Sequence, residues 1–198
     1  MSMEHKKLIN ICIKMEIEEK INIVFLGEGQ MHFIGIFSNH SEYEMIKQNI
    51  IKIVNRKDLE WIHINSKNIE NMKNIVFETI VLCHEEEMND EQKNILNKLC
   101  SNCMFIVVNA DVFCNIKIKS NKKINCISYG LNQKSTITIS SIQEDKAILS
   151  IQRNINNLEQ KSIEMGEMEI DVKKYKSSQI ENILAIFTIY LIYSKSNN

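Results

Sequence analysis

Short apolar runs alternate with helical periodicity along the first two thirds of the chain. The runs are rich in β-branched and aromatic residues and predict buried strands at residues 31–37, 60–64, 77–83, 104–110 and 124–130. Apolar residues spaced three and four apart predict helices at residues 5–20, 42–54 and 89–100. Because strands and helices alternate, we expect an α/β fold: a mostly parallel sheet flanked by helices.

The pattern changes after residue 134. Strict alternation of apolar and polar residues predicts two strands, at 135–142 and 147–154, joined by a turn at 143–146. Another alternating run, at 162–172, can add a third strand. We therefore expect a small antiparallel β-hairpin appendage within residues 135–172.

An apolar segment closes the sequence. Residues 177–193 are predicted to form a helix, with Ser177 or Ser178 as the N-cap. No linker rich in glycine or serine divides the chain, so residues 1–198 are expected to form a single domain.

The composition of the chain argues against nucleic acid and membranes as its partners. The formal net charge is -1, so nothing favours binding to nucleic acid or to an anionic membrane. The most apolar stretch, residues 180–193, is too short to span a bilayer and contains Glu181. The first 20 residues mix charged and apolar positions and do not resemble a signal peptide. We expect a cytoplasmic protein without membrane insertion.

The chain contains six cysteines, which we interpret as buried thiols in a reducing compartment: Cys12, Cys83, Cys100, Cys103, Cys114 and Cys126. Cys100 and Cys103 form a Cys-x-x-Cys pair that follows a predicted helix, whereas a redox pair lies at a helix N-terminus. A zinc site would need two further ligands, and no second close pair supplies them.

Three segments together resemble the ATP-binding central domain of Mur ligases. The strongest contains Asn109-Ala110-Asp111 at a strand end, then Tyr129-Gly130 and the hairpin. The second lies in the closing helix, where Asn182, Leu184 and Ala185 match. The third is a strand containing Gly35, followed by the segment that stands where the family has its phosphate loop. The resemblance covers about residues 20–195 and is closest to the UDP-N-acetylmuramyl-tripeptide synthetase branch.

The resemblance implies a P-loop-like fold with sites for ATP and Mg. It assigns a nucleoside site to Asn109, Asp111 and Asn182. It assigns a degenerate phosphate loop to four further residues, Gly35, Ser38, Asn39 and Ser41. No catalytic residue is assigned.

The phosphate loop departs from the family at its central positions. Glu42 stands where the family has lysine, and Tyr43 stands where it has a compact hydroxyl residue. A carboxylate repels polyphosphate, by about 4 kcal/mol for two unit charges about 4 Å apart near a protein surface. We therefore expect no tight binding of Mg-ATP.

Two further assignments have a structural alternative. His84, with Glu85, Glu86 and Glu87, falls where the family has a metal ligand, but glutamates also favour the entry to a helix. Asn109 and Asp111 fit the nucleoside site, but asparagine and aspartate also stabilise the transition from strand to loop.

The sequence leaves two hypotheses for function. The first is a non-catalytic, Mur-ligase-like module that binds another protein, such as a complete ligase, and is linked to peptidoglycan synthesis. The second is a component of an ATP-dependent amino-acid ligase that needs a partner chain. Binding of Mg-ATP distinguishes the two.

Overall fold

The computed structural model describes residues 31–113, 118, 120–175 and 179–194. The predicted helix at 5–20 lies outside these residues, as do Ser177 and Ser178. The prediction of Ser177 or Ser178 as the cap of the closing helix is wrong, because its N-cap is Gln179. The elements, in chain order, are β1 (His32–Phe37), α2 (His40–Ile53), β2 (Leu59–Ile64), η1 (Ile69–Met72), β3 (Thr79–Leu82), α3 (Asp90–Asn102), β4 (Phe105–Asn109), β5 (Asn125–Tyr129), β6 (Ile137–Ile142), β7 (Lys146–Ile151), β8 (Ile155–Asn156), β9 (Ser162–Ile163), β10 (Gly166–Asp171), η2 (Val172–Tyr175) and α4 (Ile180–Tyr193).

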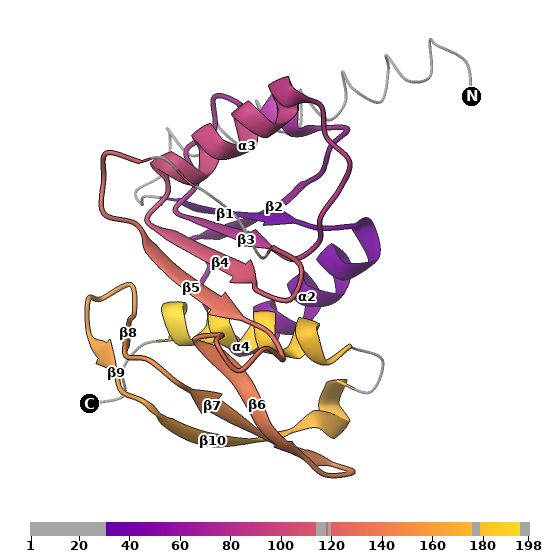
Figure 1. The fold of residues 1–198 in the computed structure, drawn as a ribbon, viewed down its shortest axis with the longest axis vertical. Helices are drawn as coiled ribbons and strands as arrows, with labels where there is room; N and C mark the ends of the chain where they lie inside the picture. The colour runs from indigo at the N-terminus through magenta and orange to yellow at the C-terminus, as the bar shows by residue number, and fades with distance from the viewer. Residues whose placement is uncertain (1–30, 114–117, 119, 176–178, 195–198) are drawn as a thin grey trace.

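Eight strands form one sheet in the order β10-β7-β6-β5-β4-β3-β1-β2 (Figure 1). The strands from β2 across to β6 are parallel. β7 is antiparallel to both of its neighbours, β6 and β10. This confirms the predicted α/β fold with a mostly parallel sheet. β8 and β9 form a separate antiparallel pair.

The predicted hairpin is present as β6 and β7, and it extends the main sheet. β6 joins β5 through the pair Tyr129 and Ile137, and β10 adds outside β7. The predicted third strand, at 162–172, divides into β9 and β10.

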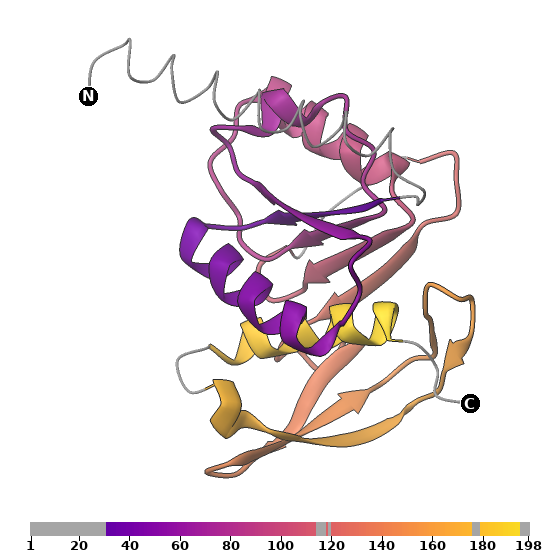
Figure 2. The same ribbon diagram turned by 180° about the vertical axis from the view of Figure 1, so that it is seen from behind.

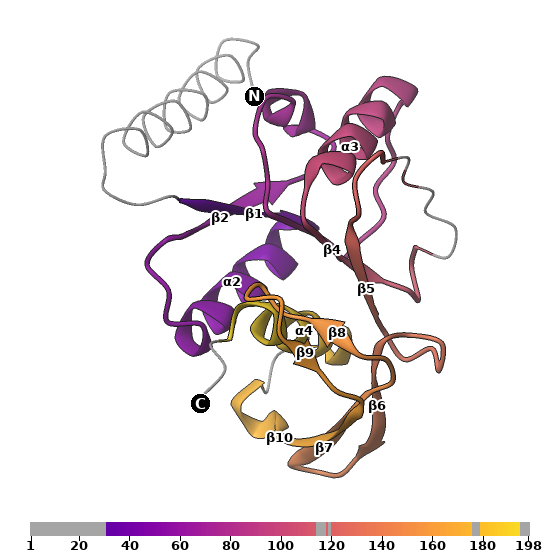
Figure 3. The ribbon, with the colours of Figure 1, turned by 90° about the vertical axis from the view of Figure 1, so that its left-hand side faces the viewer.

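Helices cover both faces of the sheet. α2 and α4 lie on one face, and α3 lies on the other (Figures 2 and 3). Residues of β1 alternate between the two cores: Ile34 and Ile36 pack with α2 and α4, and Phe37 packs with α3. Strands covered on both faces need apolar residues at successive positions, which explains the continuous apolar runs of the sequence.

α4 is apolar on most of its circumference because it is enclosed. It lies against α2 on one side and against β4, β5 and β6 on another. Ten of its fourteen residues are buried, and Phe187 and Tyr190 are partly exposed on one side. No helix among the described residues combines the length and the apolar character that crossing a bilayer requires.

Tyr193 anchors the end of α4 to the amino ends of the strands. Its hydroxyl donates to the Glu78 carboxylate (2.9 Å) and lies 2.6 Å from the Thr79 hydroxyl. Burial raises the pKa of Tyr193 well above 10, so the phenol remains a neutral donor. The guanidinium of Arg56, which pairs with Asp58, stands 5.8 Å from the centre of the Tyr193 ring.

Candidate functional site

The strand order reverses between β1 and β3. β1 connects through α2 to β2 on one side, and β3 lies on its other side. In open α/β sheets, ligands bind beyond the carboxyl ends of the strands at such a reversal. The chain segments that follow β1, β3, β4 and β5 meet at this edge, and they contain most of the residues that the sequence assigns to a site.

The connection between β1 and α2 consists of only Ser38 and Asn39. Asn39 is the N-cap of α2, and its side-chain oxygen accepts the backbone N–H of Glu42 (2.9 Å). The Glu42 carboxylate accepts the backbone N–H of Asn39 in return (3.3 Å). This reciprocal pair is a capping box.

The capping box occupies two of the backbone N–H groups that an anion would use. A helix N-terminus binds phosphate because its first backbone N–H groups lack partners inside the helix. Here the side chains of Asn39 and Glu42 accept two such N–H bonds. Glu42 also places a negative charge at the positive end of the helix dipole.

The remaining residues of the predicted phosphate loop lie in three different settings. Gly35 is inside β1, paired with Ile62 and Ile80. A Cβ at Gly35 would lie 2.5 Å from Ile64 Cδ1, so the glycine permits close packing beneath the strand. Ser38 is buried, whereas Ser41 is exposed in the first turn of α2. The structure therefore does not bring the four residues into one loop.

Asn109 and Asp111 connect the end of β4 to its neighbours. The Asn109 side chain donates to the Cys83 carbonyl (3.4 Å) and accepts the N–H of Asp111 (3.0 Å). The Asp111 carboxylate accepts the N–H groups of Leu131 (2.5 Å) and Asn132 (2.9 Å). Both side chains thus stabilise the loops at this edge, as the structural alternative predicts.

The close approach of the Asp111 carboxylate to the backbone after β5 requires a glycine at position 130. Its φ of +150° is unfavourable for other residues, and a Cβ there would lie 2.5 Å from the Asp111 carboxylate. The third predicted nucleoside residue, Asn182, is buried in the first turn of α4.

Cys83 and Tyr129 form a buried pair beneath the edge. Both side chains are fully buried or nearly so, and burial raises the pKa of Cys83 to about 12, with a smaller opposing contribution from the Tyr129 side chain. A thiol with this pKa is a poor nucleophile at neutral pH. No local pattern in the sequence predicts the pair, because Cys83 follows β3 and Tyr129 ends β5, far apart in the chain.

His84 lies in the loop between β3 and α3. His84 and Glu85 are exposed, and the Glu86 carboxylate accepts the backbone N–H of Ser66 (2.6 Å). The part of the chain that the structure describes contains no group of three or more side chains placed to hold a metal ion. α3 begins shortly afterwards with its own capping box, in which Asn89 and Gln92 exchange hydrogen bonds.

Sequence reasoning missed a histidine beside the β1–α2 connection. The His63 ring stacks on Tyr43, with ring centres 4.8 Å apart, and its Nε2 lies 2.8 Å from the Ser38 carbonyl oxygen. Tyr43 in turn donates from its hydroxyl to the Trp61 carbonyl (2.9 Å). These contacts fix the short connection against β2. A helix residue and a strand residue that meet only through folding leave no local pattern in the sequence.

The fold defines an α/β protein in which side chains at the carboxyl edge of the sheet are hydrogen-bonded to neighbouring backbone groups. No family model and no curated protein matches the sequence. The resemblance to Mur ligases therefore stays a prediction.

Proposed function

We propose that this chain is a non-catalytic, Mur-ligase-like module that acts by binding another protein in the cytoplasm, in connection with peptidoglycan synthesis. The observation that carries the proposal is the capping box of Asn39 and Glu42 at the N-terminus of α2. A complete Mur ligase is one example of such a protein partner.

The ligase reaction transfers a phosphoryl group from ATP to a substrate carboxylate, and it depends on positioned cationic groups and metal. In place of the family's lysine, the chain has Glu42, whose carboxylate is held at the helix N-terminus. Polyphosphate binding would have to displace this carboxylate and break the cap of α2. The repulsion alone is on the order of 4 kcal/mol at contact distance.

One observation favours the second candidate, a ligase component that needs a partner chain. Asn109, Asp111 and Gly130 meet at the carboxyl edge of the sheet, where the resemblance puts the nucleoside of ATP. Mg and ATP would then be ligands of the assembled enzyme. The polar atoms of Asn109 and Asp111 already have partners within the chain, which is why the non-catalytic module is the better supported candidate.

A phosphate-release assay tests the proposal. The protein is mixed with Mg-ATP, UDP-linked muramyl dipeptide and a panel of amino acids. We expect phosphate release at the background rate. Turnover that disappears in Asp111→Ala, but persists in Glu144→Ala, a matched variant at an exposed position in the turn between β6 and β7, would show that the chain is an enzyme.

A further inference from the structure

β10 is the last strand of the sheet. It pairs with β7 on one side, and among residues 31–113, 118, 120–175 and 179–194 no strand pairs with its other side. The outer backbone groups of an edge strand form a template for another strand. The outer edge of β10 is therefore a place where an extended segment can add to the sheet.

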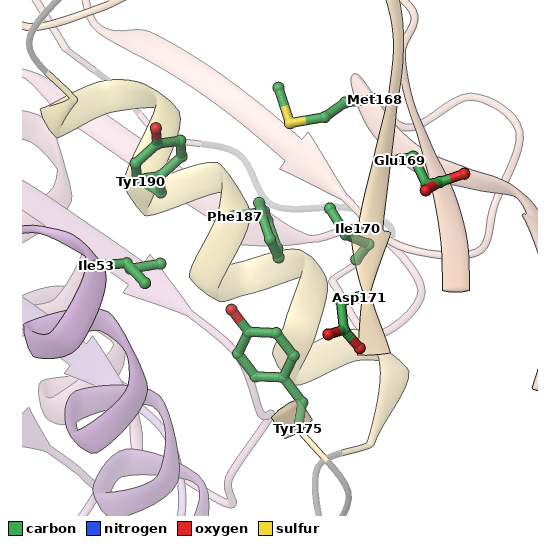
Figure 4. Close-up of a pocket in the computed structure, with 8 residues that line it drawn as sticks. All are labelled: Ile53, Met168, Glu169, Ile170, Asp171, Tyr175, Phe187 and Tyr190. Carbon is green, nitrogen blue, oxygen red and sulfur yellow. The ribbon is translucent and has the colours of Figure 1, made fainter. Parts of the chain in front are cut away.

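A largely apolar groove lies next to this edge (Figure 4). Its volume is about 440 Å³. The carboxylates of Glu169 and Asp171 border it, and its apolar and aromatic lining comes from α2, β10, η2 and α4: Ile53, Met168, Ile170, Tyr175, Phe187 and Tyr190. The three aromatic rings form a row, with Phe187 6.1 Å from Tyr175 and 6.3 Å from Tyr190 between centres. Ile53 and Met168 remain 36% and 37% exposed, so the groove offers apolar surface to a partner.

The two faces of β10 differ in chemistry. Met168 and Ile170 point toward α4 across the groove, whereas Glu169 borders the groove and points away from α4 (Figure 4). Glu167 belongs to the same face of the strand as Glu169. Glu169 pairs diagonally with Lys146 of β7 (2.6 Å), whose direct partner in the strand register is Asp171, so this face already holds a lysine beside carboxylates. A segment added to β10 would meet apolar side chains on one face and carboxylates on the other.

We propose that β10 and the groove bind an extended segment of a partner protein in which apolar residues alternate with lysine or arginine. The segment adds as a further strand, its apolar residues contacting Met168 and the aromatic row and its basic residues contacting Glu167 and Glu169. This inference rests on the proposed role as a protein-binding module and names the chemistry of the partner.

A fluorescence-anisotropy titration with the whole chain tests the inference. The probe is a short labelled peptide in which lysine and isoleucine alternate, and the control peptide replaces each lysine with glutamate. We expect saturable binding of the lysine peptide and at least a tenfold lower affinity for the glutamate peptide. Hydrogen exchange at the backbone amides of β10 should slow when the lysine peptide is bound, because the outer edge becomes paired.

Two surface variants separate the apolar and acidic contributions. Met168→Asp puts a charge at the groove and should lower the affinity for the lysine peptide by about tenfold or more, because a carboxylate in an apolar contact is unfavourable. Glu167→Lys should lower the affinity for the lysine peptide by about two- to tenfold at low salt, a range typical of exposed charge pairs. The matched control Glu85→Lys makes the same charge change on a distant exposed loop and should leave the affinity unchanged. Circular dichroism checks that each variant is folded.

Three results would overturn the inference: no binding up to millimolar peptide, equal binding of the glutamate peptide, or binding that Met168→Asp leaves intact. A concentration-dependent dimer that excludes the peptide would also overturn it, by identifying a second copy as the occupant. None of these results involves nucleotide. A failure here is therefore distinguishable from turnover in the phosphate-release assay, which would contradict the proposed function itself.

Discussion

Asn39 and Glu42 exchange hydrogen bonds at the first turn of α2, each side chain accepting the backbone N–H of the other residue. The pair closes the helix end that faces the carboxyl edge of the sheet. In a nucleotide-binding α/β protein, this end is left open to phosphate. The same two residues cap the helix, and the proposed function predicts that they exclude the phosphate that the position would otherwise attract.

The cap should contribute measurably to stability. We expect Asn39→Ala to lower the free energy of unfolding by about 0.5–2 kcal/mol, because an N–H of the first turn loses its acceptor. Urea denaturation followed by circular dichroism measures the change. Asn89→Ala is the matched control, since Asn89 makes the same kind of box with Gln92 in α3, and it should cost a similar amount. An unchanged midpoint in Asn39→Ala alone would show that the cap of α2 is not formed in solution.

Tyr193 should be a second stabilising residue. Tyr193→Phe removes the donor to Glu78 and the partner of the Thr79 hydroxyl, so we expect a loss of about 1–3 kcal/mol in the free energy of unfolding. Tyr190→Phe is the comparison, because Tyr190 is only half-buried and lines the groove; a change below about 0.5 kcal/mol is expected there. Equal effects of the two variants would contradict the anchoring role of Tyr193.

Acid should weaken the contact between Arg56 and Asp58. The hydrogen bond from Arg56 holds the pKa of Asp58 below its ordinary value of 3.8. A lowered pKa contributes stability that is fully present above the unfolded pKa and is lost as the pH falls through the folded pKa. Asp58→Asn should therefore be less stable than the wild type at neutral pH, with the difference shrinking below about pH 4. A difference independent of pH would contradict this account; both side chains are partly exposed, so the effect is small.

Thiol labelling should separate the cysteines by burial. Of the four cysteines in the described part of the chain, Cys83, Cys100 and Cys103 are buried, whereas Cys126 is exposed. Burial raises the pKa of all four thiols, to about 12 for Cys83 and Cys103. In the native protein at about pH 8, iodoacetamide should modify Cys126 faster than the three buried thiols, which should react only after denaturant is added. Peptide mapping by mass spectrometry reads the result. Rapid labelling of Cys100 or Cys103 in the folded protein would instead favour a reactive Cys-x-x-Cys pair.

Local patterns in the sequence predict much of the fold. The apolar runs predict the parallel strands, and strict alternation predicts β6 and β7. The capping box was also readable, as Asn39 followed three positions later by Glu42, but the resemblance assigned Asn39 to a phosphate loop. The sequence could not predict contacts that depend on the tertiary fold, such as Tyr193 with Glu78 or the stacking of Tyr43 on His63.

The position of β6 in the sheet is another feature that local sequence patterns could not predict. The alternation in 135–154 specifies a hairpin, but whether the hairpin stands apart or joins the sheet depends on one pairing, that of Tyr129 with Ile137. A strand edge can pair with any free edge nearby, so its partner is decided by the whole fold and not by the alternation itself.

Calorimetric titration with Mg-ATP is the decisive test of whether this chain binds nucleotide. We expect no heat of binding up to millimolar nucleotide, because Asn39 and Glu42 cap the N-terminus of α2. Weak binding of adenosine that is lost in Asn109→Ala would be compatible with a residual nucleoside site. A micromolar dissociation constant for Mg-ATP that is abolished by changes in residues 38–43 would contradict the account.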